Sequence, residues 1–272
     1  AVSAIENRVS KAVELPVNEV WAHLNDEVVK HADATSWLQA GKLKSLWTIA
    51  TKLVTVFKIL VDGSAKSVRP IFEPCTGILV SDRGTVFSFW SMSHRQICWA
   101  HLLRKFVSFA ERDGPAKDLG HQLLDCAVLM FRYWRDLKTG ALSREQFRAW
   151  MAPLRFQFEA ILADAVAADV RQLSGSCADI LAHQAALWTF VDREDVEPTN
   201  NHAERELRAF VLWRKKSFGT QSERGNLFAE RLMTVVHTAR KQNRPVLAFL
   251  TACCAARLDG SSSPSLFGAV SS

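Results

Sequence analysis

The hydrophobic pattern of the chain changes near residue 100, and this change constrains the fold more than any other feature. Between residues 27 and 99, short apolar runs alternate with turn-forming residues, which is the pattern of β-strands. These runs predict five strands, at Val28–Ala32, Leu46–Ala50, Leu53–Leu60, Gly77–Val80 and Gln96–Trp99. Only Thr51 and Lys52 separate the second run from the third, which predicts a hairpin, while Ser64–Phe72 leaves room for a crossover helix. A mixed sheet is therefore expected.

From about Ala100 onward, apolar residues recur at the spacing of helices instead. The stripes of the middle region include Leu123–Trp134 and Phe147–Val170. Helical spacing then continues through Asn201–Ser217, Leu227–Lys241 and Val246–Ala256. The order is thus a sheet, a helical block and a set of charged helices, which predicts an α/β fold.

The chain can be divided into five predicted segments. They are a helical lead-in at 1–26, the first part of a core at 27–112, a helical insertion at 113–195, the C-terminal helices of the same core at 196–258, and a tail at 259–272. The tail is rich in Gly, Ser and Pro and is expected to be disordered. Because residue 1 is Ala and Ile5–Leu15 already has a helical pattern, we expect the chain to be part of a longer protein.

Positive charge is concentrated in one stretch. The chain has 34 Lys and Arg against 28 Asp and Glu, a net charge of +6. Residues 198–244 contain ten Lys or Arg and four Asp or Glu, so this stretch accounts for the whole excess. Such clustering can form a phosphate-facing surface. Solvated helices that carry Lys and Arg for solubility explain the composition slightly better when composition is taken alone.

Cysteine spacing and hydropathy argue against several classes of protein. The six cysteines include no CxxC pair, which argues against a disulfide framework or a zinc ribbon, and Cys98 with His101 supplies two ligands where structural zinc needs four. The longest apolar stretch, Leu53–Val61, is broken by Lys58 and is too short to cross a bilayer. We therefore expect a cytoplasmic protein without a membrane partner.

Three acidic residues are candidates for a metal site. Asp33 and Asp82 follow the first and fourth predicted strands, and ligands gather at strand ends in open sheets with crossover helices. Glu204 lies in the charged helical region. Two-metal phosphoryl transfer needs at least three carboxylates from different elements, because two divalent ions must be held together.

Each of these residues also has a purely structural explanation. Asp favours strand-to-loop junctions because its side chain bonds nearby backbone amides. Glu204 fits a capping box with Asn201 as the N-cap, and it could pair with Arg208 one turn on. The other acids are expected on loops or exposed helix faces, where nothing in their spacing indicates a ligand; these include Asp62, Asp192, Asp195 and Glu230.

Two long motifs near the C-terminus, Glu197–Arg208 (EPTNNHAERELR) and Leu212–Ser222 (LWRKKSFGTQS), resemble the signature of the insertion sequence 66 family of transposases. Three upstream blocks resemble the family's other motifs in the expected order: His31–Trp37 (HADATSW), Gly77–Arg83 (GILVSDR) and Gln96–Arg104 (QICWAHLLR). The resemblance covers about residues 25–257. One departure is Ala34, which stands where the family often has Glu.

The resemblance implies a ribonuclease H-like core of the acidic-triad (DDE) type, in which a five-stranded mixed sheet is flanked by helices and a helical insertion precedes the last catalytic helix. It places the triad on Asp33, Asp82 and Glu204, which would hold two Mg²⁺ or Mn²⁺ ions. The expected DNA-binding residues are Arg205, Arg208, Arg214, Lys215, Lys216 and Arg224. Possible accessory residues are Cys98, His101, Asn200 and Asn201.

The resemblance also implies partners and a location. DNA, as transposon ends and as target, would be the substrate, and the protein would assemble as a homo-oligomer on it with accessory proteins of the same element. It would be a bacterial cytoplasmic protein associated with the nucleoid. Trp99 and Trp213 could stack on a flipped base, although packing in the core is the favoured interpretation. The alternatives are a stand-alone nuclease of the same fold and an inactive, transposase-derived DNA-binding protein.

Overall fold

The computed structural model describes residues 2–170 and 173–267. The chain forms two compact units. Unit 1 is built from the chain up to Leu79, from Gly84–Phe89 and from Asn201 onward, and unit 2 from Val80–Arg83 and Trp90–Asn200. Unit 1 is therefore assembled from segments that are distant in the sequence.

Five strands form one mixed sheet in the order β3-β2-β1-β4-β5. Their bounds are β1 Val29–Gln39, β2 Lys42–Ala50, β3 Thr55–Leu60, β4 Ile78–Ser81 and β5 Arg95–Ile97. β1, β2 and β3 are antiparallel neighbours, which confirms the expected hairpin between the second and third strands. A second hairpin joins β1 to β2 through Ala40 and Gly41, which both have positive φ, at 48° and 76°.

β1 is much longer than its apolar run. The prediction that the first strand ends at Asp33 is wrong, because β1 continues to Gln39 and Asp33 lies inside it. The strand continues because alternate side chains of its polar half still reach the core, as the fully buried Trp37 shows. Asp82, in contrast, directly follows β4, as expected.

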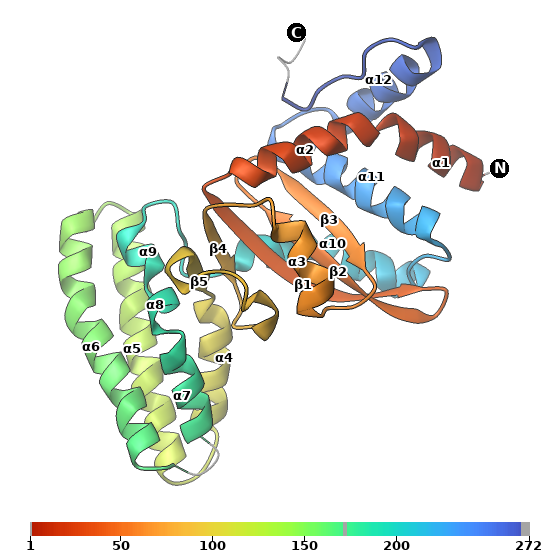
Figure 1. The fold of residues 1–272 in the computed structure, drawn as a ribbon. Helices are drawn as coiled ribbons and strands as arrows, with labels where there is room; N and C mark the ends of the chain where they lie inside the picture. The colour runs from red at the N-terminus through yellow and green to blue at the C-terminus, as the bar shows by residue number, and fades with distance from the viewer. Residues whose placement is uncertain (1, 171–172, 268–272) are drawn as a thin grey trace. The chain divides into compact units, whose positions relative to one another are not determined.

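Helices cover both faces of the strands of unit 1 (Figure 1). They are α1 Val2–Ala12, α2 Glu14–Asp26, α3 Ala65–Phe72, α10 Asn201–Ser217, α11 Glu223–Lys241 and α12 Val246–Asp259. α3 is the expected crossover helix, and Ser64 caps it by accepting a hydrogen bond from the Ser67 amide. In Figure 1, α3 lies in front of the strands and α10 behind them.

The core of unit 1 lies between α10, α11 and the face of β1–β3 that they cover. Its buried members are Trp37, Leu46, Phe57, Ile59, Leu207, Phe210 and Ala229, with Trp213 and Met233 packed against them. Leu207, Phe210 and Trp213 recur at helical spacing, so α10 places one apolar stripe on the sheet. This stripe fixes which face of α10 is turned toward β1.

α11 runs along the outer edge of β3 and bonds its backbone. Glu230, Thr234 and Thr238, spaced four residues apart, accept hydrogen bonds from the amides of Ile59, Phe57 and Thr55 at 2.7, 3.2 and 3.1 Å. These three amides point away from β2. At the edge of a sheet they would lack an acceptor, and the side chains of α11 supply one for each of them. The expectation that Glu230 lies on an exposed helix face is therefore wrong, since the residue is 6% exposed.

Unit 2 contains a bundle of helices. They are α4 Trp99–Ala110, α5 Pro115–Lys138, α6 Arg144–Ala167, α7 Ser174–Ala182, α8 Gln184–Leu187 and α9 Thr189–Asp192. Aromatic side chains fill its interior; among them Trp99 packs on Phe158 and Trp188 with ring centroids about 5 Å apart. The helical block expected at 113–195 lies within this unit, and the exact limits of the insertion stay a prediction.

Residues 260–267 follow a defined path, although the tail was expected to be disordered. Leu266 is 1% exposed, and the carbonyl of Ser265 accepts a hydrogen bond from Arg244 at 3.1 Å. The burial of Leu266, an apolar residue among small polar ones, holds this segment against the rest of the protein. The remainder of the predicted tail, 268–272, lies outside the described residues. Among those that are described, no helix is long and apolar enough to cross a membrane.

Candidate functional site

Asp33 lies on the side of β1 that faces α10. Side chains alternate along a strand, so residues 31, 33, 35 and 37 share one face. The neighbours of Asp33 on that face each contact α10: His31 lies against His202 with ring centroids 5.1 Å apart, Thr35 accepts a hydrogen bond from Arg214 at 3.3 Å, and Trp37 packs on Phe210 at 5.3 Å. Asp33 is half-buried, and its carboxylate accepts a hydrogen bond from the Ala34 amide at 2.8 Å.

Glu204 lies in the first turn of α10 and is also half-buried. The helix begins at Asn201, so Asn200, not Asn201, is the residue that precedes it. A capping box that uses Asn201 as the N-cap therefore does not match the helix as it is built. Asp33 and Glu204 both belong to unit 1, and the face of β1 that carries Asp33 is the one covered by the helix of Glu204.

Asp82 belongs to unit 2, where a buried arginine holds its backbone. The Arg95 guanidinium, 1% exposed, donates to Ser81 Oγ at 3.2 Å and to the Asp82 carbonyl at 2.9 Å. Burial lowers the pKa of Arg95, and the nearby charge of Asp82 opposes that shift. The sequence analysis did not single out Arg95. The available signal was a basic residue directly before the predicted apolar strand Gln96–Trp99.

The accessory candidates mark the connection between β5 and the segment that leads to α10. Cys98 is fully buried before α4, and its sulfur accepts a hydrogen bond from the Asn200 amide at 3.1 Å. The next amide, that of Trp99, donates to the Pro198 carbonyl at 2.9 Å. His101 is half-buried in the first turn of α4, while Asn201 is exposed. Cys98 and Asn200 thus have a structural task within unit 2.

The predicted DNA-binding cations differ in their exposure. Those whose side chains are exposed are Arg205, Arg208, Lys215, Lys216 and Arg224, and Arg224 also contacts the Ser3 hydroxyl. Arg214 is half-buried and bonds Thr35 and Ser36 on β1. Arg214 therefore attaches the last turn of α10 to the strand of Asp33.

A buried cluster of charged and polar side chains connects α10 to α11. The sequence analysis did not identify it. Lys241 donates to Glu206 at 3.2 Å and to His202 Nε2 at 2.8 Å, and His237 is hydrogen-bonded to Glu206. Burial alone would raise the pKa of Glu206, but the hydrogen bond from His237 and the charge of Lys241 lower it to about 2. Burial and then Lys241 lower the pKa of His202 to about 4. Glu206 is thus ionised and His202 neutral at neutral pH.

Both tryptophans considered for base stacking pack against protein side chains. Trp99 is fully buried and donates to the Leu187 carbonyl at 2.8 Å. Trp213 is stacked on Phe210, with an interplanar angle of 17°. The interpretation that these rings pack in the core is confirmed.

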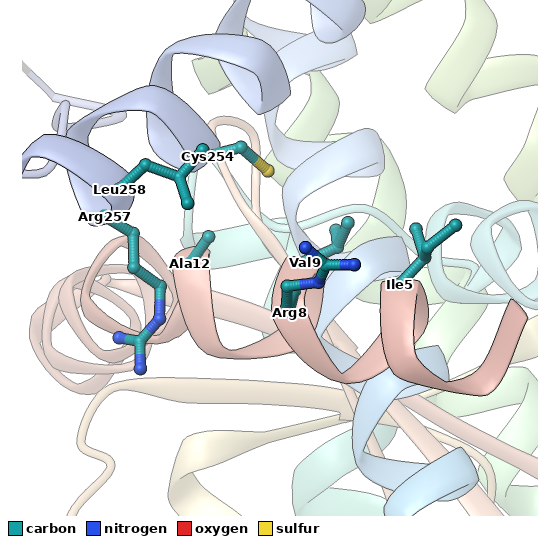
Figure 2. Close-up of a pocket in the computed structure, with 7 residues that line it drawn as sticks. All are labelled: Ile5, Arg8, Val9, Ala12, Cys254, Arg257 and Leu258. Carbon is teal, nitrogen blue, oxygen red and sulfur yellow. The ribbon is translucent and has the colours of Figure 1, made fainter. Parts of the chain in front are cut away.

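An apolar pocket of about 370 Å³ lies between α1 and α12 (Figure 2). Ile5, Val9 and Ala12 of α1 face Cys254 and Leu258 of α12, with Arg8 and Arg257 at the rim. None of the predicted site residues lines it. No carboxylate that could hold a metal ion lines the pocket, so it is not the candidate site.

Half-buried carboxylates on a sheet and on a helix, together with exposed cations on that helix, are the kinds of groups that enzymes acting on nucleic-acid phosphates use. The model of the Transposase IS66 family matches residues 1–227, and the chain belongs to this family. The family predicted from the sequence motifs is thereby confirmed. Comparison with curated proteins found no match. Transposases act on DNA, so family membership indicates an enzyme whose substrate is DNA.

Proposed function

We propose that this chain is the catalytic region of a DDE-type transposase with a ribonuclease H-like core. It cleaves DNA at transposon ends and joins the freed 3′ ends to target DNA, both by in-line phosphoryl transfer. The observation that carries the proposal is the orientation of Asp33, which lies on the face of β1 covered by the helix of Glu204. A purely structural role for the Asp33 carboxylate would not require it to lie on the face that the helix of Glu204 covers.

Asp33, Asp82 and Glu204 would hold two Mg²⁺ or Mn²⁺ ions. Carboxylate oxygens are the ligands that these hard cations prefer, and all three side chains are half-buried, neither sealed in a core nor fully solvated. The residues present therefore fit the group. When bound, such ions polarise the scissile phosphate and lower the pKa of a water.

The side chains of the protein itself bind and orient the DNA. Arg205, Arg208, Lys215, Lys216 and Arg224 neutralise backbone phosphates, which gives binding that weakens with salt and carries little sequence information. Arg214 fixes the end of α10 on β1, and Arg95 fixes the backbone at Asp82. Cys98, His101, Asn200 and Asn201 have positioning roles at the starts of α4 and α10. Assembly as a homo-oligomer on two DNA ends, with accessory proteins of the same element, completes the proposal.

The test is Mn²⁺-dependent nicking and strand transfer on labelled transposon-end DNA. Glu204→Gln keeps the shape of the side chain and removes its charge, so we expect cleavage to fall by more than about 100-fold while DNA binding persists. Glu223→Gln is the matched control, since Glu223 is an exposed glutamate in the first turn of the neighbouring α11. It should cleave normally.

The outcomes separate the alternatives. Cleavage without strand transfer would identify a stand-alone nuclease, and DNA binding without cleavage a transposase-derived binding protein. Equal cleavage by the wild-type chain and Glu204→Gln would remove Glu204 from the metal site and leave it a helix-stabilising residue.

A further inference from the structure

Phe218 combines an unfavourable backbone conformation with an exposed ring. It directly follows α10 and has a φ of 55°, the left-handed conformation that helices normally give to Gly or Asn at this position. Its amide bonds the Arg214 carbonyl at 2.9 Å, which closes the helix. The side chain is 74% exposed. Phenylalanine thus has a conformational cost here and gains little burial in return.

The loop that carries Phe218 is fastened to the end of β1. The Thr220 amide donates to the Leu38 carbonyl at 2.9 Å, and the Ala40 amide donates to the Thr220 carbonyl at 2.8 Å. Gly219 has a φ of 87°, and a Cβ there would lie 2.0 Å from the Leu38 carbonyl oxygen. The approach is too close for any other residue. Phe218 therefore stands on a fixed loop.

The surroundings of the loop are strongly basic. Lys215 and Lys216 directly precede it, and the tip of the β1–β2 hairpin to which it is fastened adds Lys42 and Lys44. The single acid between residues 207 and 229 is Glu223, which lies 3.6 Å from Lys44. An exposed ring amid cations matches the pattern of single-strand binding sites, where rings stack on bases and cations hold phosphates.

We propose that Phe218 binds an unstacked nucleobase at an open DNA end, while Lys215, Lys216 and Lys42 hold the flanking phosphates. The inference deepens the proposed function and rests on DNA being the substrate. Because the Phe218 ring is already exposed, it can insert between two neighbouring bases without first breaking packing contacts within the protein.

Binding of two labelled duplexes tests the proposal, one blunt and one with a short single-stranded end. The assays use the full chain with Glu204→Gln and no divalent metal, so cleavage plays no part. We expect tighter binding of the open-ended DNA. Phe218→Gly should reduce that affinity about 5- to 100-fold and leave blunt-end affinity within about twofold. Phe218→Trp should keep the preference, and Leu247→Ala, at an equally exposed position of α12, should change nothing.

Thermal melting shows whether Phe218→Gly weakens DNA binding only because it destabilises the fold. Gly suits the left-handed conformation, so Phe218→Gly should melt at the same or a higher temperature. A lower melting temperature together with weaker binding of both DNAs would overturn the proposal, as would an unchanged preference in Phe218→Gly. Failure of Mn²⁺-dependent cleavage in the wild-type chain, with the Phe218-dependent preference intact, would instead overturn only the catalytic proposal.

Discussion

The ammonium group of Lys241 joins three parts of unit 1. Besides Glu206 and His202 of α10, it donates to the carbonyls of Thr51 and Val54, at 2.7 and 3.1 Å, in the turn between β2 and β3. Burial lowers the pKa of Lys241, and Glu206 opposes that shift. One side chain of α11 therefore holds both the start of α10 and a turn of the sheet.

Replacing Lys241 should be costly because it leaves Glu206 charged, buried and short of a partner. We expect Lys241→Met to reduce the free energy of unfolding by roughly 3–5 kcal/mol, measured by urea denaturation. The double variant Lys241→Met/Glu206→Gln removes both charges and should recover part of the loss. If the two changes were simply additive, the ion pair would have no role in seating α10.

Individual residues of the candidate site were only partly predictable. The spacing around Glu204 favoured a helix cap over a metal ligand, and only the family motif pointed to the metal site. Arg95 and the Glu206–Lys241 pair were missed because a buried charge is recognised by its partners, which lie far away in the sequence. Phe218 was missed because its left-handed backbone conformation cannot be predicted from the residue type.

At the scale of elements, α11 covers the edge of β3 with polar side chains, so its stability depends on hydrogen bonds as well as packing. Thr234→Val preserves the shape of the side chain and removes the acceptor for the buried Phe57 amide. We expect a loss of about 1–3 kcal/mol in the free energy of unfolding, the cost of an unsatisfied buried donor. Thr251→Val, at an exposed position of α12, is the control and should change it by less than about 0.5 kcal/mol.

The elements themselves were largely predictable from hydrophobic spacing. All five strands, the crossover helix and the long helices lie near their expected positions, because each buries an apolar stripe of its own period. The departures from prediction lie in β1 and in the turn that follows it. β1 extends through polar residues that are supported by α10, and the β1–β2 turn uses Ala40 and Gly41 in place of a typical Asn-Gly pair.

At the scale of the whole molecule, positive charge is unevenly distributed. The predicted insertion, residues 113–195, has twelve acids against nine bases, whereas residues 198–244 carry the chain's entire positive excess. DNA phosphates should therefore be bound by α10 and the loop after it, and only weakly by the insertion. This separation can be measured as a salt dependence.

Neutralising two cations on α10 should weaken the salt dependence of DNA binding. We expect Lys215→Gln/Lys216→Gln to reduce the slope of log K against log salt concentration by about 2, since each phosphate contact contributes about 0.9. Lys117→Gln/Lys138→Gln removes the same charge from exposed positions of α5 and should leave the slope unchanged. Equal slopes for the two double variants would indicate that net charge alone governs binding.

The interruption of unit 1 by unit 2 also sets the order in which a ribosome delivers the parts. β1, β2 and β3 are synthesised early, but α10 and α11, which cover their apolar face, follow more than a hundred residues later. At bacterial elongation rates of about 5–20 residues per second, the roughly 140 residues between β3 and α10 take about 7–28 s to synthesise, and that face stays uncovered for at least this time. During that interval Trp37, Leu46 and Phe57 of the nascent chain are not yet buried, so we expect chaperones to bind it until residue 229 has left the exit tunnel.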